Sequence, residues 1–494
     1  MRRSKGQGAR GALVGGTLAL VLAGGAWPAG AAGTNGLPRA APTRPALPAA
    51  PTQPTSMQAT STQATSTQAA PPVPAAGAGP QNILPPDQSA PIVEPEPTTQ
   101  PIGPQPIVEP IMHWTVRDAQ ALLDAIRGID AEGLYPADYQ PDALASAIAG
   151  GASDLLDHQA SLSFDWLAED LRDGRTPMDA RVQWFAVDPD SSSPTLATNV
   201  LLARATQTHD VAGTLASLDP AYPDYAALRQ ALAQTPTSDT ATRNGIRVNM
   251  DRWRWLPQTL GEIYLVANVP EFEVRLMRDQ RVVRTFRTIV GKPGRTETPQ
   301  LAQQVQAVVF NPTWTIPQSI IEHEHMTADK ARAKGFKVTE NGDGSLTIVQ
   351  PPGDNNSLGR MKIDMPNPEA IYLHDTPEKY LFDRKVRAFS HGCIRTEHAD
   401  MLGMTMAMLG AHMTVDRANA LYNAKKYARI PMERTFPVYI TYTTMGLDND
   451  RQLVFFDDIY GRDAPVLKSF DQPRQLHTTQ RTSSQEVIVA DDPL

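Results

Sequence analysis

The sequence predicts an α+β protein in which an N-terminal helical scaffold domain is followed by a mainly β domain. Three observations predict this order. Apolar residues recur at helical spacing after Met112, strands of alternating polarity begin near Glu262, and a Pro-rich tract without apolar periodicity precedes both. The chain has 494 residues, which is enough for two or three domains of ordinary size.

Residues 1–31 have the three parts of a secretory signal peptide. A basic stretch without acids precedes an uncharged apolar run at residues 12–26, and the small-residue pattern Ala29-Gly30-Ala31 follows. The run is shorter than the roughly 20 residues that span a bilayer, so we expect cleavage, with an uncleaved inner-membrane anchor as the alternative. Both outcomes place the rest of the chain outside the cytoplasm.

Residues 32–111 are rich in Pro, Ala, Thr and Gln and cannot bury a hydrophobic core. The pentapeptide PIVEP occurs twice, at residues 91–95 and 106–110. We expect a long disordered linker, partly polyproline II. It is interpreted either as a tether that meets a partner or the membrane, or as a spacer without a partner.

Residues 112–240 are expected to form the helical scaffold domain, because they contain helical periodicity and no titratable cluster typical of catalysis. Thr235 to Asn244 is interpreted as a polar linker that closes this domain. The expected helices include residues 155–171 and 225–233, with shorter helical patterns at 144–148 and 197–206.

Residues 245–470 are expected to form the mainly β domain, with its core at about residues 262–418. Phe272, Val274 and Leu276 alternate with charged residues, which is the period of a half-buried strand, and Asp279-Gln280 follows as a hairpin turn. Residues 471–494 are expected to be a disordered tail. The predicted strands are 262–267, 272–276, 282–290, 305–310, 346–349, 370–374, 438–443 and 453–456, with a helix at about 398–410.

The composition excludes several classes of protein. The net charge is −8 and the pI about 5.7, whereas nucleic-acid-binding proteins usually carry a basic patch, so no nucleic-acid partner is expected. A single cysteine, Cys393, forms no internal disulfide and no multi-thiolate metal site. Glu322-His323-Glu324-His325 lacks a third spaced ligand. We therefore expect no metal and no cofactor.

Cys393 lies in the string Ser390-His391-Gly392-Cys393-Ile394-Arg395, and a predicted strand ends upstream at His374. An imidazole or a helix N-terminus next to a thiol lowers the pKa of the thiol and makes it a nucleophile. The backbone N–H groups of Gly392 and Cys393, just before the predicted helix, suit an oxyanion site. The alternative is a buried structural cysteine.

The string resembles the catalytic motif of the L,D-transpeptidases, whose YkuD-type domain has an upstream His and then Ser/Thr-His-Gly-Cys-x-Arg. The flanking blocks resemble the larger, YcbB-like periplasmic subgroup. These blocks are Arg252-Trp253-Arg254-Trp255-Leu256-Pro257, Val290-Gly291-Lys292-Pro293, Phe310-Asn311-Pro312-Thr313-Trp314, Asn356-Ser357-Leu358-Gly359-Arg360, Tyr372-Leu373-His374-Asp375-Thr376-Pro377 and Asp458-Ile459-Tyr460-Gly461-Arg462-Asp463.

The resemblance implies an acyl transfer on peptidoglycan stem peptides in the periplasm, in cell-wall biogenesis and cell shape. Cys393 would attack a tetrapeptide stem, release D-Ala and pass the acyl group to a second stem as a 3→3 crosslink. His374 would be the general base and acid. The resemblance further assigns His391 and Gly392 to the oxyanion site, Arg395 and Ser390 to supporting roles, and Tyr372 and Trp314 to the substrate pocket.

Two alternatives to this reaction stay open at the level of sequence. One is an L,D-carboxypeptidase or hydrolase that uses the same Cys393 with water as acceptor. The other is a non-catalytic wall-binding scaffold. A covering lid would favour an amine over water, and we place it at residues 322–350, which are rich in Gly and charge. The Pro-rich linker would contact the membrane or wall-synthesis partners.

Overall fold

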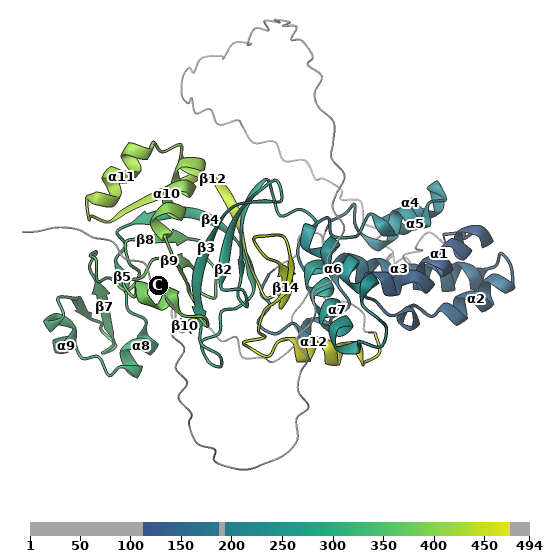
Figure 1. The fold of residues 1–494 in the computed structure, drawn as a ribbon, viewed down its shortest axis with the longest axis horizontal. Helices are drawn as coiled ribbons and strands as arrows, with labels where there is room; N and C mark the ends of the chain where they lie inside the picture. Colours follow the sequence, from purple (N-terminus) through teal and green to yellow (C-terminus); the bar gives the residue numbers. More distant parts are fainter. Residues whose placement is uncertain (1–111, 187–192, 475–494) are drawn as a thin grey trace, which may run out of the picture. The chain divides into compact units, whose positions relative to one another are not determined.

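The computed structural model describes residues 112–186 and 193–474 (Figure 1). The predicted signal peptide, the Pro-rich segment and residues 475–494 lie outside the described residues. In the part of the chain that is described, no helix combines the length and the apolar character needed to cross a membrane. A helical region comes first and a mainly β region follows, which confirms the predicted fold class.

The helical region consists of α-helices joined by short connections and 3-10 turns. Side chains cap several first turns: Thr115, Ser153 and Asp210 each accept a hydrogen bond from a backbone N–H. Leu122 and Phe164 lie at the centre of a hydrophobic cluster that the first of these helices share. The helices are α1 (Val116–Gly128), α2 (Pro141–Ala149), α3 (Asp154–Asp173), α4 (Thr198–Thr208), α5 (Val211–Ala216), α6 (Pro223–Gln234) and α7 (Thr240–Arg254), with 3-10 turns η1 (Ile129–Glu132), η2 (Pro136–Tyr139) and η3 (Met178–Ala180).

Helix α7 corrects the predicted polar linker at residues 235–244. The helix begins at Thr240, where the Asp239 side chain accepts from the Thr242 N–H. Its buried face contains Arg243, Arg247 and Arg254. Ile246, Met250 and Trp253 recur at helical spacing on that face, but the buried arginines interrupt the apolar pattern and the expectation missed the helix.

The second region is built on one sheet, nine-stranded within the described residues, in the order β10-β3-β11-β9-β8-β4-β12-β1-β2. Strand β2 also pairs with β3, so the strands from β3 to β2 close on themselves. The turn predicted at Asp279-Gln280 joins β2 to β3, and both residues have positive φ. The strands are β1 (Ile263–Asn268), β2 (Glu273–Arg278), β3 (Arg281–Gly291), β4 (Leu301–Phe310), β8 (Met361–Asp364), β9 (Leu373–His374), β10 (Ala388–Ser390), β11 (Ile394–Thr396) and β12 (Ala428–Thr441).

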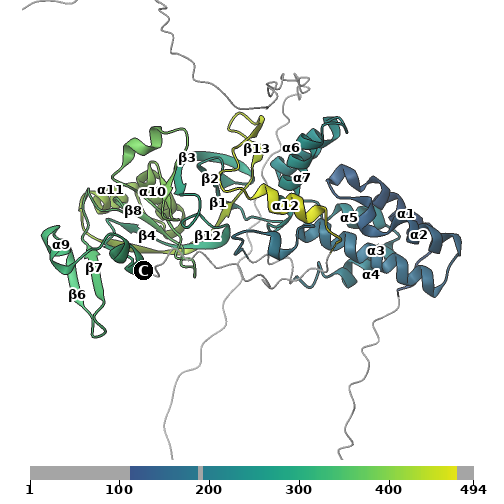
Figure 2. The same cartoon turned by 90° about the horizontal axis from the view of Figure 1, so that it is seen from below.

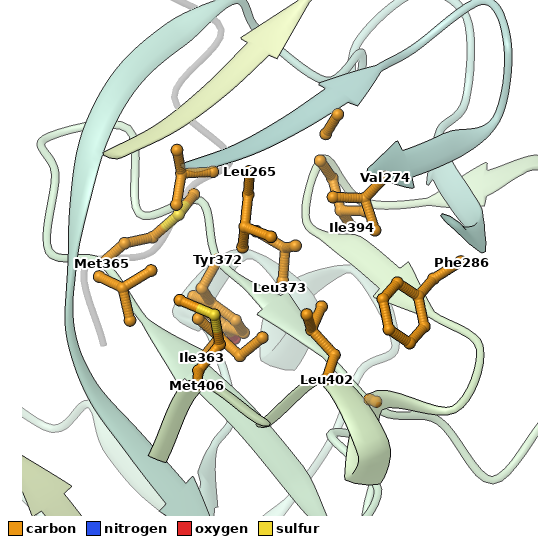
Figure 3. Close-up of a cluster of buried hydrophobic side chains, with 14 of the residues drawn as sticks. Leu265, Val274, Phe286, Ile363, Met365, Tyr372, Leu373, Ile394, Leu402 and Met406 are labelled. Atoms are coloured by element: carbon orange, nitrogen blue, oxygen red, sulfur yellow. The ribbon is translucent and has the colours of Figure 1, made fainter. Parts of the chain in front are cut away.

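Helices α10 (Ala399–Ala411) and α11 (Val415–Asn423) follow β11, and α10 packs on β12, β4 and β8 (Figure 2). Leu402 and Met406 of α10 enter the hydrophobic core of the sheet beside Ile363 (Figure 3). The helix confirms the sequence prediction for residues 398–410. Strand β12 starts ten residues before the predicted strand at 438. Its first part is only half-buried and contains Pro431, a residue that is usually excluded from the middle of a sheet.

The segment predicted as a lid is part of a small folded layer between β4 and β8. It contains β5 (Trp314–Thr315), α8 (Gln318–His323), α9 (Ala328–Ala333), β6 (Lys337–Glu340) and β7 (Leu346–Gln350). Its strands form a separate sheet in the order β5-β7-β6, and Ile316, Ile321 and Ile348 belong to its own hydrophobic cluster. The layer therefore has a core of its own and is not an open Gly-rich loop.

The C-terminal part returns to the helical region. It contains β13 (Met445–Leu447), β14 (Leu453–Phe455) and α12 (Asp463–Phe470). Beyond α12 the structure corrects the start of the predicted disordered tail, because Arg474 is ordered against α3. Its guanidinium is 3% exposed and donates to Glu169 at 2.6 Å and to Asp170. The sequence did not predict this contact, because a single arginine in a polar segment has no recognisable pattern.

Candidate active site

The two catalytic candidates lie on neighbouring parallel strands. Ile394 pairs with Leu373 and Arg395 pairs with His374, so one step earlier in this register Cys393 lies beside Tyr372. Because successive side chains of a strand alternate between faces, Cys393 and Arg395 share a face with His374. Leu373 and Ile394 lie between them on the opposite face, in the hydrophobic core (Figure 3).

His374 is held as a neutral base by its surroundings. The ring is 5% exposed, and Nδ1 lies 2.5 Å from the Asp375 carbonyl oxygen. A carbonyl only accepts, so Nδ1 carries the hydrogen and Nε2 keeps a lone pair. Burial lowers the pKa of His374 to about 3, and the positive charge of Arg395 acts in the same direction.

The Cys393 thiol is also neutral in this structure. Burial raises its pKa to about 11, although contacts with Tyr372 and the charge of Lys362 partly oppose that shift. The sulfur lies 3.6 Å from the Ala370 carbonyl oxygen, and His374 is not its hydrogen-bond partner among the described residues. Although Cys393 is only half-buried by its exposed area, burial outweighs the stabilisation of charge in setting the direction of this pKa, and β11 separates Cys393 from the N-terminus of α10.

Strand β9 is shorter than the predicted strand at 370–374. Asn367 closes a turn before it: its amide accepts from the Ile371 N–H at 3.0 Å and donates to the Ile371 carbonyl at 2.7 Å. Ala370 in this turn has a φ of 52°. The turn presents the Ala370 carbonyl to the Cys393 sulfur, so a local side-chain bond replaces strand pairing at the site.

The loop at residues 390–393 is closed by the Ser390 hydroxyl. Ser390 Oγ donates to the Cys393 carbonyl at 2.6 Å and accepts from the Gly392 N–H at 3.2 Å. Ser390 therefore closes the loop. The Gly392 N–H, predicted as part of the oxyanion site, donates to Ser390 Oγ in this structure. Among the described residues no acceptor is assigned to the Cys393 N–H, so that group stays available.

The remaining predicted residues surround this centre. Arg395 forms an ion pair with Glu378, which fixes its guanidinium near His374. The Tyr372 and His374 rings lie 5.5 Å apart between centroids, so Tyr372 lines the same face. His391 is exposed at the edge of the loop. Trp314 lies on β5 and is partly buried between the core of the sheet and that of the small layer.

Three further residues of the site had no sequence signal of their own. Lys362 on β8 pairs across from His374, with Nζ 4.1 Å from the centroid of the Tyr372 ring. The Asp375 carboxylate accepts from the Arg360 N–H at 2.9 Å and orders the end of β9. Thr298 donates to the Gly392 carbonyl at 2.7 Å. These contacts join distant parts of the chain, which spacing along the sequence does not reveal.

Comparison with known proteins adds two domain matches. Residues 262–406 match the L,D-transpeptidase catalytic domain, YkuD, and residues 112–232 match a scaffold domain. The chain carries an L,D-transpeptidase catalytic domain behind a scaffold domain. This confirms the resemblance that the sequence motifs indicated, including the YcbB-like order of the two parts. Every predicted site residue, from Trp314 to Arg395, lies inside the L,D-transpeptidase domain.

Individual proteins are also similar to this chain. A Haemophilus influenzae protein, whose name assigns it to the L,D-transpeptidases, is 31% identical over 254 residues, covering 47% of this chain and 50% of the relative. The chain thus spans about half the length of this curated relative. Among solved structures, an L,D-transpeptidase from Mycobacterium smegmatis has 16% identity, covers 36% of this chain and 58% of its own, and has a TM-score of 0.20. An L,D-transpeptidase from Enterococcus faecium has 13% identity and a TM-score of 0.19. The match covers 38% of this chain and 52% of the Enterococcus faecium chain.

Among the described residues, no group of three or more His, Cys, Asp and Glu side chains is arranged to hold a metal ion. The pairing of β11 with β9 brings the Cys393 thiol and the His374 imidazole to the same face of two adjacent strands.

Proposed function

We propose that this chain is a cysteine-dependent L,D-transpeptidase that forms 3→3 crosslinks between peptidoglycan stems. The observation that carries the proposal is the placement of its single thiol, Cys393, on the same strand face as the neutral base His374 within an L,D-transpeptidase domain. A nucleophile and a base on adjacent strands can act on one carbonyl between them.

In the first half-reaction Cys393 attacks the carbonyl of the third residue of a tetrapeptide stem. The S–C bond forms as the thiol proton passes to His374 Nε2, the nitrogen that has a free lone pair. When the tetrahedral intermediate collapses, the C–N bond to the terminal D-Ala breaks. The imidazolium returns its proton to the departing amine, and a thioester on Cys393 remains.

In the second half-reaction a side-chain amine of another stem attacks the thioester. His374 removes the proton of the attacking amine, the C–S bond breaks, and the proton returns to the Cys393 sulfur. The new amide joins the third residues of two stems. Water in place of the amine would give a carboxypeptidase, so the acceptor decides between the two activities.

The electrostatics of the site determine when the thiol loses its proton. With the pKa of Cys393 near 11 and that of His374 near 3, the resting pair is thiol and imidazole. The proton is therefore transferred during the attack and not before it. The thiol also has to leave the Ala370 carbonyl and turn toward His374, a rearrangement that substrate binding would bring about.

The oxyanion formed in each half-reaction needs a donor. The Cys393 N–H has no acceptor among the described residues and belongs to the nucleophile itself, so it suits this role. The Gly392 N–H is occupied by Ser390 Oγ. We therefore assign the oxyanion site to the Cys393 N–H, with His391 at its exposed edge.

The proposed setting of the reaction is the periplasm. It rests on the signal-peptide pattern of residues 1–31, with residues 32–111 as a tether toward the membrane, the wall or other enzymes of wall synthesis. Peptidoglycan stems are the proposed partners because the matched domain belongs to a family that acts on them.

The function is tested with protein beginning near residue 112 and a purified disaccharide-tetrapeptide, with products measured by mass spectrometry. A dimer one D-Ala lighter than two substrates is expected for the wild type and not for Cys393→Ala. His374→Gln should lose the product, while His412→Gln, which changes an exposed histidine, should keep it. Monomeric tripeptide alone would establish water as the acceptor, and no Cys393-dependent product would refute the proposal.

A further inference from the structure

The block Asp458-Ile459-Tyr460-Gly461-Arg462-Asp463 takes no part in the proposed reaction and lies outside the matched catalytic domain, residues 262–406. The structure places it against residues 291–298, the connection between β3 and β4. That connection in turn contacts the catalytic loop at residues 390–393. A chain of buried polar contacts therefore ends at the nucleophile.

Thr298 is the residue of this chain that contacts the loop. It is fully buried, and its hydroxyl donates to the Gly392 carbonyl at 2.7 Å while accepting from the Gly291 N–H at 2.9 Å. The Thr298 hydroxyl thus both donates and accepts a hydrogen bond, and the two bonds fix the direction of its O–H. The loop is also held by the Lys292 N–H, which donates to the Ser390 carbonyl at 3.1 Å.

The Gly392 carbonyl belongs to the same peptide unit as the Cys393 N–H. A peptide unit is planar and trans, so its C=O and N–H point in opposite directions. A bond that fixes the Gly392 carbonyl on one side therefore aims the Cys393 N–H to the other. It also polarises the peptide and strengthens the N–H as a donor. Gly392 has a φ of 113°, a conformation that L residues rarely adopt, so a glycine suits this position before the nucleophile.

We propose that Thr298 is a positioning residue that orients the Cys393 N–H as the oxyanion donor, and that the 458–463 block holds Thr298 in place. This inference rests on the proposed acyl transfer, because the direction of the N–H matters only when a carbonyl carbon is attacked. It assigns a role to residues outside the matched catalytic domain.

Tyr460 holds both ends of the connection that carries Thr298. Its hydroxyl donates to the Gly291 carbonyl at 2.6 Å and accepts from the Thr298 N–H at 3.3 Å. The two ends also approach so closely that a Cβ at Gly291 would lie 1.8 Å from the Thr296 carbonyl oxygen. The connection is therefore a closed loop, clamped by one phenol.

Arg462 and Asp458 hold Tyr460. The Arg462 guanidinium is 2% exposed, lies 4.8 Å from the centroid of the Tyr460 ring, and donates to the Thr298 carbonyl at 3.2 Å. The Asp458 carboxylate accepts from the Arg462 N–H at 2.9 Å. Finally, Arg252 of α7 donates to Asp463 at 2.6 Å, so the positioning contacts extend from the catalytic loop to a helix that precedes the sheet.

The test compares two reactions of the single thiol. Acylation of Cys393 by p-nitrophenyl acetate passes through an oxyanion: the sulfur bonds to the acetyl carbon, p-nitrophenolate leaves, and His374 takes the proton. Alkylation by iodoacetamide is a displacement at saturated carbon and forms no oxyanion. We expect Thr298→Val to slow acylation about 10- to 100-fold, as loss of oxyanion stabilisation does, and to change alkylation less than about twofold.

Conservative variants complete the series. Thr298→Ser keeps the hydroxyl and should restore acylation to within about threefold of the wild type, and Tyr460→Phe should slow it by about three- to tenfold. The matched controls are Thr441→Val and Tyr225→Phe, which remove buried hydroxyls bonded to Ala267 and Glu132. Both should acylate at the wild-type rate. If Thr298→Val does not fold, the acylation rate of Tyr460→Phe, compared with that of its control Tyr225→Phe, tests the inference.

Two results would overturn the inference: wild-type acylation in Thr298→Val and Tyr460→Phe, or a parallel loss of acylation and alkylation, which would mean that the loop has merely collapsed. Because neither reagent is a peptidoglycan stem, the test is separate from that of the proposed function. An enzyme that makes no crosslinks could still show the selective loss, and a confirmed transpeptidase could fail to show it.

Discussion

Arg395 lies directly opposite His374 in the parallel pairing of β11 with β9. The register places the Arg395 guanidinium and the His374 imidazole on one face of two adjacent strands, and Glu378 pairs with the guanidinium. Burial and the positive charge of Arg395 both lower the pKa of His374. The imidazole therefore stays neutral, with a free lone pair, far below neutral pH.

The first prediction concerns this pair. Arg395→Gln removes a positive charge, so the pKa of His374 should rise from its value of about 3. Because the base must be neutral, the acid limb of the pH–rate profile for Cys393 acylation should move to higher pH, and activity near pH 4–5 should fall first. Arg429→Gln, which removes an arginine paired with Asp364, is the control. An unmoved acid limb in Arg395→Gln would contradict the assignment.

The second prediction concerns the proton on the nucleophile. Because burial raises the pKa of Cys393 to about 11, alkylation by iodoacetamide should still increase between pH 8 and pH 10 without reaching a plateau. Cys393 is the only cysteine of the chain, so the mass of the intact protein reports this thiol alone.

The control for the second prediction is the same protein unfolded in denaturant, where the thiol should titrate near its ordinary pKa of 9.0. A plateau already reached at pH 7 in the folded protein would show a thiolate stabilised by an imidazolium. That result would mean that the resting pair is ionised and that the proton moves before the attack, contrary to the proposed mechanism.

The third prediction concerns the glycine behind the catalytic strand. Gly359 has a φ of 62°, and a Cβ there would lie 2.4 Å from the Asp375 carboxyl carbon. Gly359→Ala should therefore cost about 2–4 kcal/mol in the free energy of unfolding, from backbone strain and overpacking together. Because Asp375 follows His374, acylation of Cys393 should fall as well.

Gly335→Ala is the matched control for Gly359→Ala. Gly335 has a φ of 79°, but a Cβ added there would have nothing within 4 Å. In Gly335→Ala the free energy of unfolding, measured with denaturant, should fall by only about 1 kcal/mol, the cost of the backbone strain. The acylation rate should not change. Equal losses in the two variants would refute the role assigned to the contact with Asp375.

The fourth prediction concerns the residues after α12. Arg474→Ala leaves the fully buried Asp170 without its guanidinium, and should cost about 3–5 kcal/mol in the free energy of unfolding. Burial already raises the pKa of Asp170 to about 7, with Arg474 opposing that shift. Asp170 of the variant should take up a proton more readily, so the loss should be larger at pH 8 than at pH 5.

The control for Arg474→Ala is Arg434→Ala, which breaks an ion pair with Glu262 in which both side chains are 51% exposed. A change of about 1 kcal/mol or less is expected there, because solvent screens exposed pairs. If Arg474→Ala were equally mild, the contact of Arg474 with Asp170 would contribute nothing measurable to stability, contrary to this prediction.

Much of the fold was accessible from local pattern. The helices at α3 and α10 and the hairpin of β2 and β3 were predicted because each has an apolar stripe or alternation within a few turns or residues. Helix α7 and the first half of β12 were not, since arginines interrupt the buried face of α7, and Pro431 and a register shift interrupt the first half of β12. Periodicity detects burial of apolar side chains, and it is blind to burial of paired charges.

The sequence by itself determined the fold class, the order of the two regions and the candidate nucleophile and base, because Cys393 lies in one contiguous motif and His374 ends a predicted strand upstream of it. Only the tertiary structure decided that both groups rest neutral, that Ser390 occupies the Gly392 N–H, and that Thr298 reaches the Gly392 carbonyl. The reason is physical: a pKa and the direction of a hydrogen bond depend on burial and on charges brought close by strand pairing. Those neighbours are set by the closing of the sheet and not by spacing along the sequence.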